Sequence, residues 1–166
     1  MRFWDSSALV PLVVRQTASG RMRSLYRSDA TVVSWWGTRI ECESALSRLE
    51  RDGLLRRKSA TAARARLDRF ATTWHEVEPS DLLREAARRL LRLHDLRAAD
   101  SVQLAAALAA CEGRPATLAF VCLDERLAIA AEREGFVVVQ ALAPQRTSAG
   151  ARSVEGHRRA RRPRRR

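Results

Sequence analysis

The chain has 166 residues and a formal net charge of +12, from 31 Lys and Arg against 19 Asp and Glu. This length suits one domain, which can bury a core without disulfides. Nine Arg and one Glu lie in residues 144–166, so the positive charge is concentrated there and indicates a polyanionic partner. The three cysteines form no CxxC pair, and no apolar run reaches the ~18 residues of a membrane span. We therefore expect a cytoplasmic protein with buried free thiols.

In chain order, the first half of the sequence alternates short apolar runs with segments of helical periodicity. The expected elements are a strand over 2–5, a helix over 8–14 capped by Ser6 and Ser7, a helix over 17–28, a strand over 30–34, and helices over 38–51 and 59–72. The helix over 38–51 is expected to stop near Gly53, because glycine favours helix ends.

The second half continues the alternation. The expected elements are a strand over 74–77, helices over 80–94 and 98–111, a strand over 117–123, a helix over 125–134 and a strand over 136–140. Strands that alternate with helices predict an α/β fold with a mostly parallel sheet. Residues 1–143 are expected to form this domain. Residues 144–166 have almost no large apolar side chains and are expected to be disordered alone.

Acidic side chains follow the expected strands, at the edge where open α/β sheets bind ligands. Asp5 ends the first strand, and Asp124 ends the strand over 117–123. Glu41 and Asp100 lie in the first turns of the helices over 38–51 and 98–111. Asp5, Asp100 and Asp124 also suit helix capping or a helix N-terminus, which is the structural alternative for each of them.

Glu41 has a different alternative and a rival. Thr38-x-x-Glu41 matches a capping box, in which the glutamate reaches back to the cap amide. Glu43 is the rival, but about 200° of helix rotation separates it from Glu41, so both cannot face one site. Its neighbours Ser47 and Glu50 indicate a solvent-facing side, which favours Glu41 as the functional acid.

Four carboxylates at one sheet edge repel one another unless a cation lies among them. No basic residue in the sequence obviously pairs with them there. Mg²⁺ is a hard ion that takes a few carboxylates, keeps several waters and completes its shell with substrate phosphate. The pattern therefore predicts metal-assisted hydrolysis of phosphodiesters.

Four sequence stretches, in this order, carry a resemblance to a known family: residues 3–10, 38–46, 96–105 and 123–128. Over about residues 1–141 the chain resembles the PIN-domain ribonucleases, specifically the VapC-type toxins of toxin–antitoxin pairs. The resemblance implies a three-layer α/β/α PIN-like fold with a roughly five-stranded parallel sheet. It also implies RNA as substrate, a homodimer, and silencing by a cognate antitoxin.

The resemblance also implies roles for single residues. Asp5, Glu41, Asp100 and Asp124 would be the acidic quartet that holds Mg²⁺ or Mn²⁺ for catalysis. Ser7 matches the small hydroxyl residue after the first acid, where it would orient a carboxylate or a water.

The basic tail and the Trp35-Trp36 pair stand outside the pattern. The Arg-rich segment, represented by Arg158, Arg159, Arg161 and Arg162, either adds phosphate affinity or is a dispensable extension. The tryptophans either offer a stacking platform for bases or pack in the core or a dimer interface.

Rival functions find less support in the sequence. No GxGxxG follows a strand and no GxxxxGK[ST] occurs, which disfavours a nucleotide-binding domain. Lys58 is the one lysine, and it lies far from any strand end, where phosphoacceptor or phosphatase folds would want it. His75, His94 and His157 lack metal-like spacing and are expected at the surface or in packing. The remaining alternative is a catalytically inactive PIN-like module that binds RNA or an antitoxin.

Overall fold

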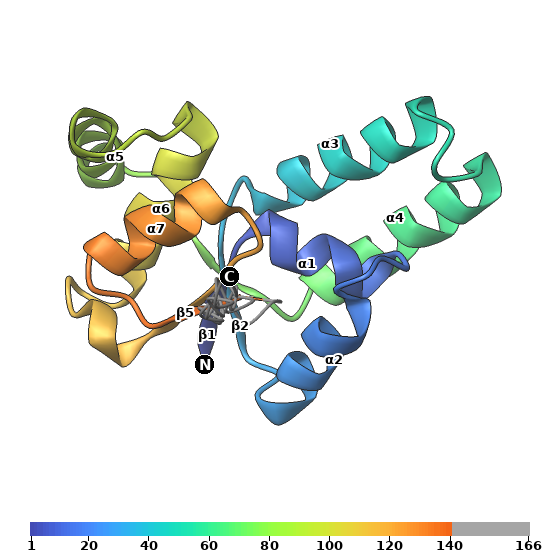
Figure 1. The fold of residues 1–166 in the computed structure, drawn as a ribbon, viewed down its shortest axis with the longest axis horizontal. Helices are drawn as coiled ribbons and strands as arrows, with labels where there is room; N and C mark the ends of the chain where they lie inside the picture. The colour runs from blue at the N-terminus through green and yellow to red at the C-terminus, as the bar shows by residue number, and fades with distance from the viewer. Residues whose placement is uncertain (141–166) are drawn as a thin grey trace, which may run out of the picture.

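Short aromatic and β-branched runs form a five-stranded, wholly parallel sheet in the computed structural model, which describes residues 1–140 (Figure 1). The strand order is β3-β2-β1-β4-β5, with β1 in the centre. The strands are β1 (Arg2–Trp4), β2 (Val32–Trp35), β3 (His75–Val77), β4 (Ala119–Val121) and β5 (Val138–Val139). The expected parallel α/β architecture is confirmed.

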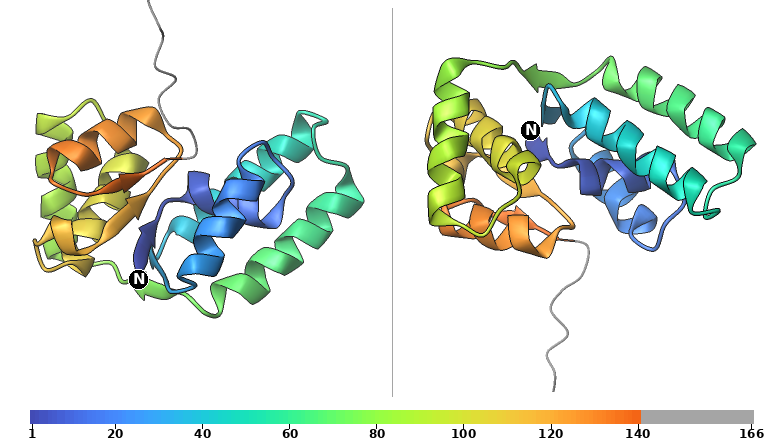
Figure 2. Two further views of the ribbon diagram at one scale, coloured as in Figure 1. Left: turned by 60° about the horizontal axis from the view of Figure 1, so that its bottom comes forward. Right: turned by 90° about the horizontal axis from the view of Figure 1, so that it is seen from above.

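Helices connect the strands and cover both faces of the sheet. They are α1 (Ser6–Val13), α2 (Ser19–Ser28), α3 (Thr38–Arg51), α4 (Arg57–Ala71), α5 (Asp81–Leu93), α6 (Ala98–Ala110) and α7 (Glu125–Arg133), with a short 3-10 turn, η1 (Pro115–Thr117), before β4. In both views of Figure 2, α5, α6 and α7 lie together on one side of the strands, and α1 to α4 lie on the other.

Alternation along the strands produces the two cores, because successive side chains point to opposite faces. Phe3 points to the α5–α7 side, where its ring stacks on Phe120 with the centroids 5.3 Å apart. Trp4 points to the α1–α4 side and packs with Val32 and Val121. The chain thus forms the three layers of an α/β/α fold.

Most expected elements are observed, with shifted ends. The expected and observed bounds of α3 coincide, and Gly53 follows this helix with φ +72°, a conformation that favours glycine. α1 begins at Ser6 because Asp5, and not a serine, caps it. The expected strand over 117–123 is shorter, since η1 takes up Thr117 and β4 spans only Ala119–Val121, and the last strand contains only Val138 and Val139.

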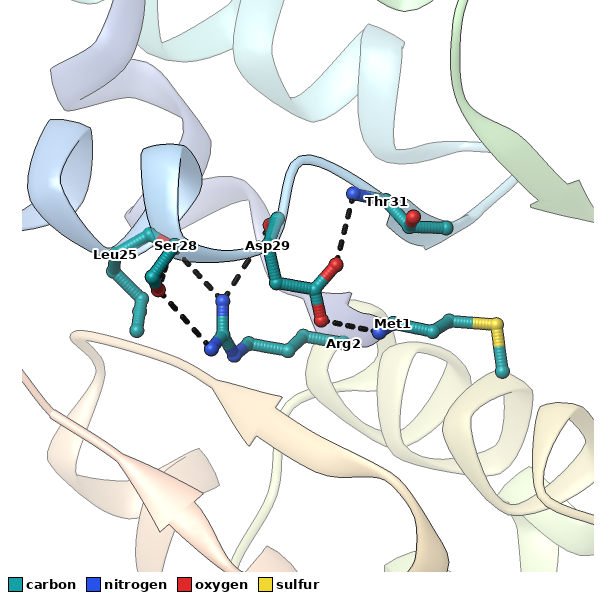
Figure 3. A network of polar contacts seen from close by, with 6 residues as sticks. All are labelled: Met1, Arg2, Leu25, Ser28, Asp29 and Thr31. Atoms are coloured by element: carbon teal, nitrogen blue, oxygen red, sulfur yellow. Dashed lines mark hydrogen bonds and ion pairs between the residues drawn. The ribbon is translucent and has the colours of Figure 1, made fainter.

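A polar network fixes the start of β1, at the end of the sheet opposite the acids (Figure 3). The guanidinium of Arg2 donates to the Leu25 carbonyl (2.8 Å) and to the Ser28 hydroxyl (3.2 Å). Asp29 accepts from the Thr31 amide (3.2 Å) and pairs with the amino group of Met1. Arg2 thereby satisfies a carbonyl at the C-terminal end of α2 and ties this helix to the central strand.

The three cysteines are buried and unpaired, as expected. Within residues 1–140, no helix combines the length and apolar character that crossing a bilayer requires. The expected domain boundary at residues 143 and 144, the expected disorder of the tail, and Arg158, Arg159, Arg161 and Arg162 all lie outside the described residues, so these remain predictions.

Candidate functional site

The four acids follow the carboxyl ends of neighbouring strands or begin adjacent helices. Asp5 follows the central strand and is 4% exposed, and Asp124 follows β4 next to it. Glu41 and Asp100 lie in the first turns of α3 and α6. The sheet order therefore brings the acids to one edge, as the sequence predicts.

The electrostatics of the acids show which of them are neighbours. Burial raises the pKa of Asp5 above its ordinary value despite hydrogen bonds from Ser7, and the charge of Asp100 adds to the rise. Burial also raises the pKa of Glu41, with the charges of Asp5 and Asp100 as further causes. Asp100 has a raised pKa too, mainly through burial and then through the charge of Asp124. All four carboxylates thus lie within electrostatic reach of another member of the group.

Cations do not neutralise this group. None of the ion pairs found within residues 1–140 includes any of the four acids. Arg97 and Arg126 lie near enough to lower the pKa of Asp100, but this effect is smaller than that of burial. Of the four acids, Asp100 therefore feels nearby positive charge without forming an ion pair with it.

Asp5 is held by the turn that follows it. Its Oδ2 accepts from the amide of Ser7 (2.9 Å) and from the Ser7 hydroxyl. The same hydroxyl oxygen accepts from the amide of Leu123 (2.9 Å). Ser7 therefore joins the first acid to the segment that carries Asp124.

Glu41 does not form the capping box that its spacing suggests. α3 has Gly37 as N-cap, and Thr38 is already the first helical residue. A Cβ at Gly37 would lie 2.5 Å from the indole nitrogen of Trp35, so the packing of Trp35 selects glycine at this cap. Glu41 Oε2 instead accepts from the Ser6 hydroxyl (2.9 Å) and from the Gln103 amide nitrogen (2.9 Å).

Asp100 and Asp124 do form the structural bonds that capping predicts. Asp100 Oδ2 accepts from the amide of Arg97 (3.2 Å) at the start of α6. Asp124 is the N-cap of α7, and its Oδ1 accepts from the amide of Leu127 (2.9 Å). The Asp124 amide in turn donates to Cys122 Sγ (3.2 Å).

A common pattern emerges from the four carboxylates. Each receives its hydrogen bonds on one oxygen: Oδ2 of Asp5, Oε2 of Glu41, Oδ2 of Asp100 and Oδ1 of Asp124. None of the hydrogen bonds found within residues 1–140 reaches the second oxygen of any of them. The protein thus orients each group through one oxygen, and the other has no hydrogen bond from the described residues.

The donor chemistry suits a hard cation, although no compact ligand cluster is formed in advance. In the described residues, no three His, Cys, Asp or Glu side chains are grouped closely enough to hold a metal ion together. Mg²⁺ does not require such a group, because it usually takes one or two carboxylates and keeps several waters. Asp5 and Glu41, with Asp100 nearby, are the residues that would hold such an ion directly or through water.

Glu43, the rival of Glu41, faces α4. Its Oε1 pairs with Arg64 at 2.6 Å, and Arg64 also pairs with Glu50 at 2.8 Å and donates to Ser47 at 3.0 Å. Glu43 therefore belongs to a polar contact between α3 and α4, and Glu41 alone of the two faces the other acids.

The two tryptophans of the Trp35-Trp36 pair have different environments. Trp35 packs against the core on the α5–α7 side, whereas Trp36 is 46% exposed. Trp36 and Ile40 line a cavity of about 390 Å³ between α3, α4 and β3. The lining of this cavity includes none of the four acids, so it is separate from the candidate site.

The histidines lie away from the acids. The His94 side chain is 8% exposed, and its Nε2 lies 2.7 Å from Glu134 Oε1, which links the ends of α5 and α7. His75 is exposed on β3, and His157 lies outside the described residues.

Sequence reasoning missed two residues at the site, Ser6 and Gln103. Ser6 was interpreted only as a helix cap, and Gln103 only as one of few polar residues in α6. The available signal was a buried amide on a helix that is otherwise nearly apolar, since such a group needs a polar partner.

Comparisons with known proteins support the fold. No family model and no curated protein matches the chain. Among solved structures, one similar chain belongs to a structure described as a toxin–antitoxin complex from Klebsiella pneumoniae. The similarity has a TM-score of 0.58 at 14% identity and covers 86% of this chain and 98% of the other. At this identity the two chains share a fold over almost the whole described domain.

Proposed function

We propose that the protein is a metal-dependent endoribonuclease, the toxin of a toxin–antitoxin pair, which uses Mg²⁺ or Mn²⁺ at Asp5, Glu41, Asp100 and Asp124. The observation that carries the proposal concerns Glu41. Unlike the three aspartates, it caps no helix, yet it is partly buried within electrostatic reach of Asp5 and Asp100 and is held by Ser6 and Gln103. A third carboxylate beside two others is electrostatically unfavourable, and a bound cation would offset this repulsion.

The chemistry follows from the orientation of the acids. A bound divalent ion would activate water and neutralise charge that develops on the phosphate. Ser7 fixes Asp5, and Ser6 with Gln103 fixes Glu41, so the oxygens without hydrogen bonds can hold the ion or its waters in a defined geometry. Burial raises the pKa of Asp5 and Glu41, so their ionised forms are less favourable than in water, and a bound cation would favour those ionised forms.

The biological role rests on the resemblance of the sequence motifs and on the shared fold. The similar solved chain comes from a toxin–antitoxin complex, which supports an antitoxin as partner. RNA as substrate agrees with the positive charge of the whole chain. We further propose that the protein acts in the cytoplasm as a homodimer.

The first test is cleavage of total RNA by purified protein with Mg²⁺ or Mn²⁺. We expect the Asp5→Asn and Glu41→Gln variants to lose at least ~100-fold of the activity, as losses of groups that stabilise transition-state charge typically do. Glu43→Gln is the matched control, because it makes the same change on the other side of α3, where Glu43 contacts Arg64, and should retain activity. Equal cleavage by wild type, Asp5→Asn and Glu41→Gln would refute the nuclease.

Expression in cells tests the toxin role separately. The wild type should arrest growth, the Glu41→Gln variant should not, and co-expression of a small protein encoded beside the gene should relieve the arrest. Normal growth with confirmed wild-type expression would count against a toxin. Mapping RNA ends shortly after induction would identify the RNA that is cut.

The second candidate is an inactive module that binds RNA or an antitoxin. It is favoured by the bonds of Asp5, Asp100 and Asp124 to helix-terminal amides, which give these three acids a structural use. This candidate predicts RNA or antitoxin binding that is unchanged by chelators, whereas the nuclease requires the ion.

A further inference from the structure

Gln103 is a buried polar side chain close to the acids, at 1% exposure on α6. Its neighbours on this helix, Leu104 to Ala107, are buried and apolar. An amide in such surroundings costs free energy unless its donors and acceptor are paired. Its partners therefore indicate why an apolar residue does not occupy the position.

The partners of Gln103 lie on a different helix. The amide nitrogen donates to Glu41 Oε2 (2.9 Å) and to Thr38 Oγ1 (3.1 Å), and Thr38 Oγ1 lies 3.3 Å from the amide oxygen. Thr38 is itself fully buried at the start of α3. This arrangement ties the first turn of α3 to α6 across the sheet edge.

The direction of the amide follows from the charge of Glu41. A glutamine turned the other way would present its carbonyl oxygen to a carboxylate, which repels it, whereas its NH₂ group donates to the carboxylate. Ser6, from α1, donates to the same Oε2. Donors from two helices thus converge on one oxygen of Glu41 and leave Oε1 without a hydrogen bond from the described residues.

We propose that Gln103 is a positioning residue, which fixes the Glu41 carboxylate so that Oε1 is the oxygen offered to a divalent cation. This inference deepens the proposed function and rests on it. Removing a residue that hydrogen-bonds to a metal ligand typically weakens metal binding by 10–100-fold. A purely structural Gln103 would affect unfolding and leave the affinity for the ion unchanged.

The test compares three variants of the full chain. Gln103→Leu has a similar volume and no donor, Gln103→His restores an N–H donor of similar reach, and Thr38→Val removes the neighbouring hydroxyl without touching Glu41. For each variant we would measure Mn²⁺ affinity from the electron paramagnetic resonance signal of free Mn²⁺, the thermal midpoint, and kcat and KM for RNA.

We expect Gln103→Leu to weaken Mn²⁺ binding by ~10–100-fold and to lower kcat more than it raises KM. Gln103→His should restore most of the affinity, and Thr38→Val should lose less than Gln103→Leu. Wild-type Mn²⁺ affinity in Gln103→Leu, or an equal loss in the leucine and histidine variants, would overturn the positioning role.

The outcomes separate this inference from the proposed function. A wild type that binds Mn²⁺ with the expected dependence on Gln103, yet cleaves no RNA, would refute the nuclease and support the positioning role. RNA cleavage that depends on Glu41 but not on Gln103 would support the nuclease and refute the positioning role. A wild type without measurable Mn²⁺ binding would overturn the positioning role as well.

Discussion

Replacing Ser7 by alanine tests whether the acids are oriented by the turn after β1. The Ser7 hydroxyl donates to Asp5 Oδ2 and accepts from the amide of Leu123 at 2.9 Å. The variant loses both bonds, whereas the Ser7 amide still donates to Asp5. It therefore weakens the hold on a buried carboxylate and leaves a backbone N–H of the β4–α7 segment without its partner.

The magnitude follows from these two bonds. A hydrogen bond to a charged group contributes about 1.5–3 kcal/mol and a neutral one about 0.5–1.5 kcal/mol. Ser7→Ala should therefore lower the free energy of unfolding by about 2–4 kcal/mol when Asp5 is ionised, and by less when it is protonated. For a chain of this size that corresponds to a midpoint lower by roughly 6–12 °C.

Thermal unfolding by circular dichroism, without divalent ions, measures this loss, and amide hydrogen exchange at Leu123 locates it. Ser59→Ala is the matched control, because Ser59 is exposed near the start of α4 and should change stability by less than about 0.5 kcal/mol. If Ser7→Ala unfolds like Ser59→Ala, with unchanged exchange at Leu123, the proposed orientation of Asp5 by Ser7 is wrong.

Three further predictions concern charge. Burial raises the folded-state pKa of Asp5, so without metal its contribution to stability is fully present below its ordinary pKa of about 4 and is lost as pH rises through the folded value. Asp5→Asn should remove this contribution from the pH dependence of unfolding, and an unchanged pH dependence would contradict it. Ca²⁺ should support much less RNA cleavage than Mg²⁺, since Ca²⁺ prefers six to eight oxygens and bidentate carboxylates. Equal cleavage rates would argue against carboxylates that each offer a single oxygen to the ion. Deleting residues 144–166 should weaken RNA binding and make it less dependent on salt. The slope of log affinity against log salt concentration should fall by up to about 0.7 for each lost phosphate contact to single-stranded RNA. An unchanged slope would mean that the tail is dispensable for binding.

The elements were predictable wherever local sequence decides them. The bounds of α3 follow from its periodicity and from Gly53, which takes the left-handed conformation that favours glycine. The edge strand β5 was overestimated, because apolar character in residues 136–140 reflects packing of Phe136 in the core as well as strand pairing. Local pattern alone does not separate these two causes of burial.

Part of the candidate site was likewise predictable from the sequence, and part was not. Asp5 and Asp124 were predictable from their place after strands of a parallel sheet, because strand direction brings such residues to one edge. The capping box at Glu41 was wrong, since helix start and side-chain partners depend on Gly37 packing under Trp35 and on Gln103. The contact between Glu41 and Gln103 joins residues 62 positions apart along the chain.

By itself, the sequence determined the charge balance, the alternation of strands and helices, and the acids at strand ends, all of which depend on residue type and short-range spacing. The tertiary structure decided which oxygen of each carboxylate is held, that Glu41 and not Glu43 joins the group, and that Gln103 and Ser6 are its partners. These features depend on distances between α1, α3 and α6, which only the packed fold fixes.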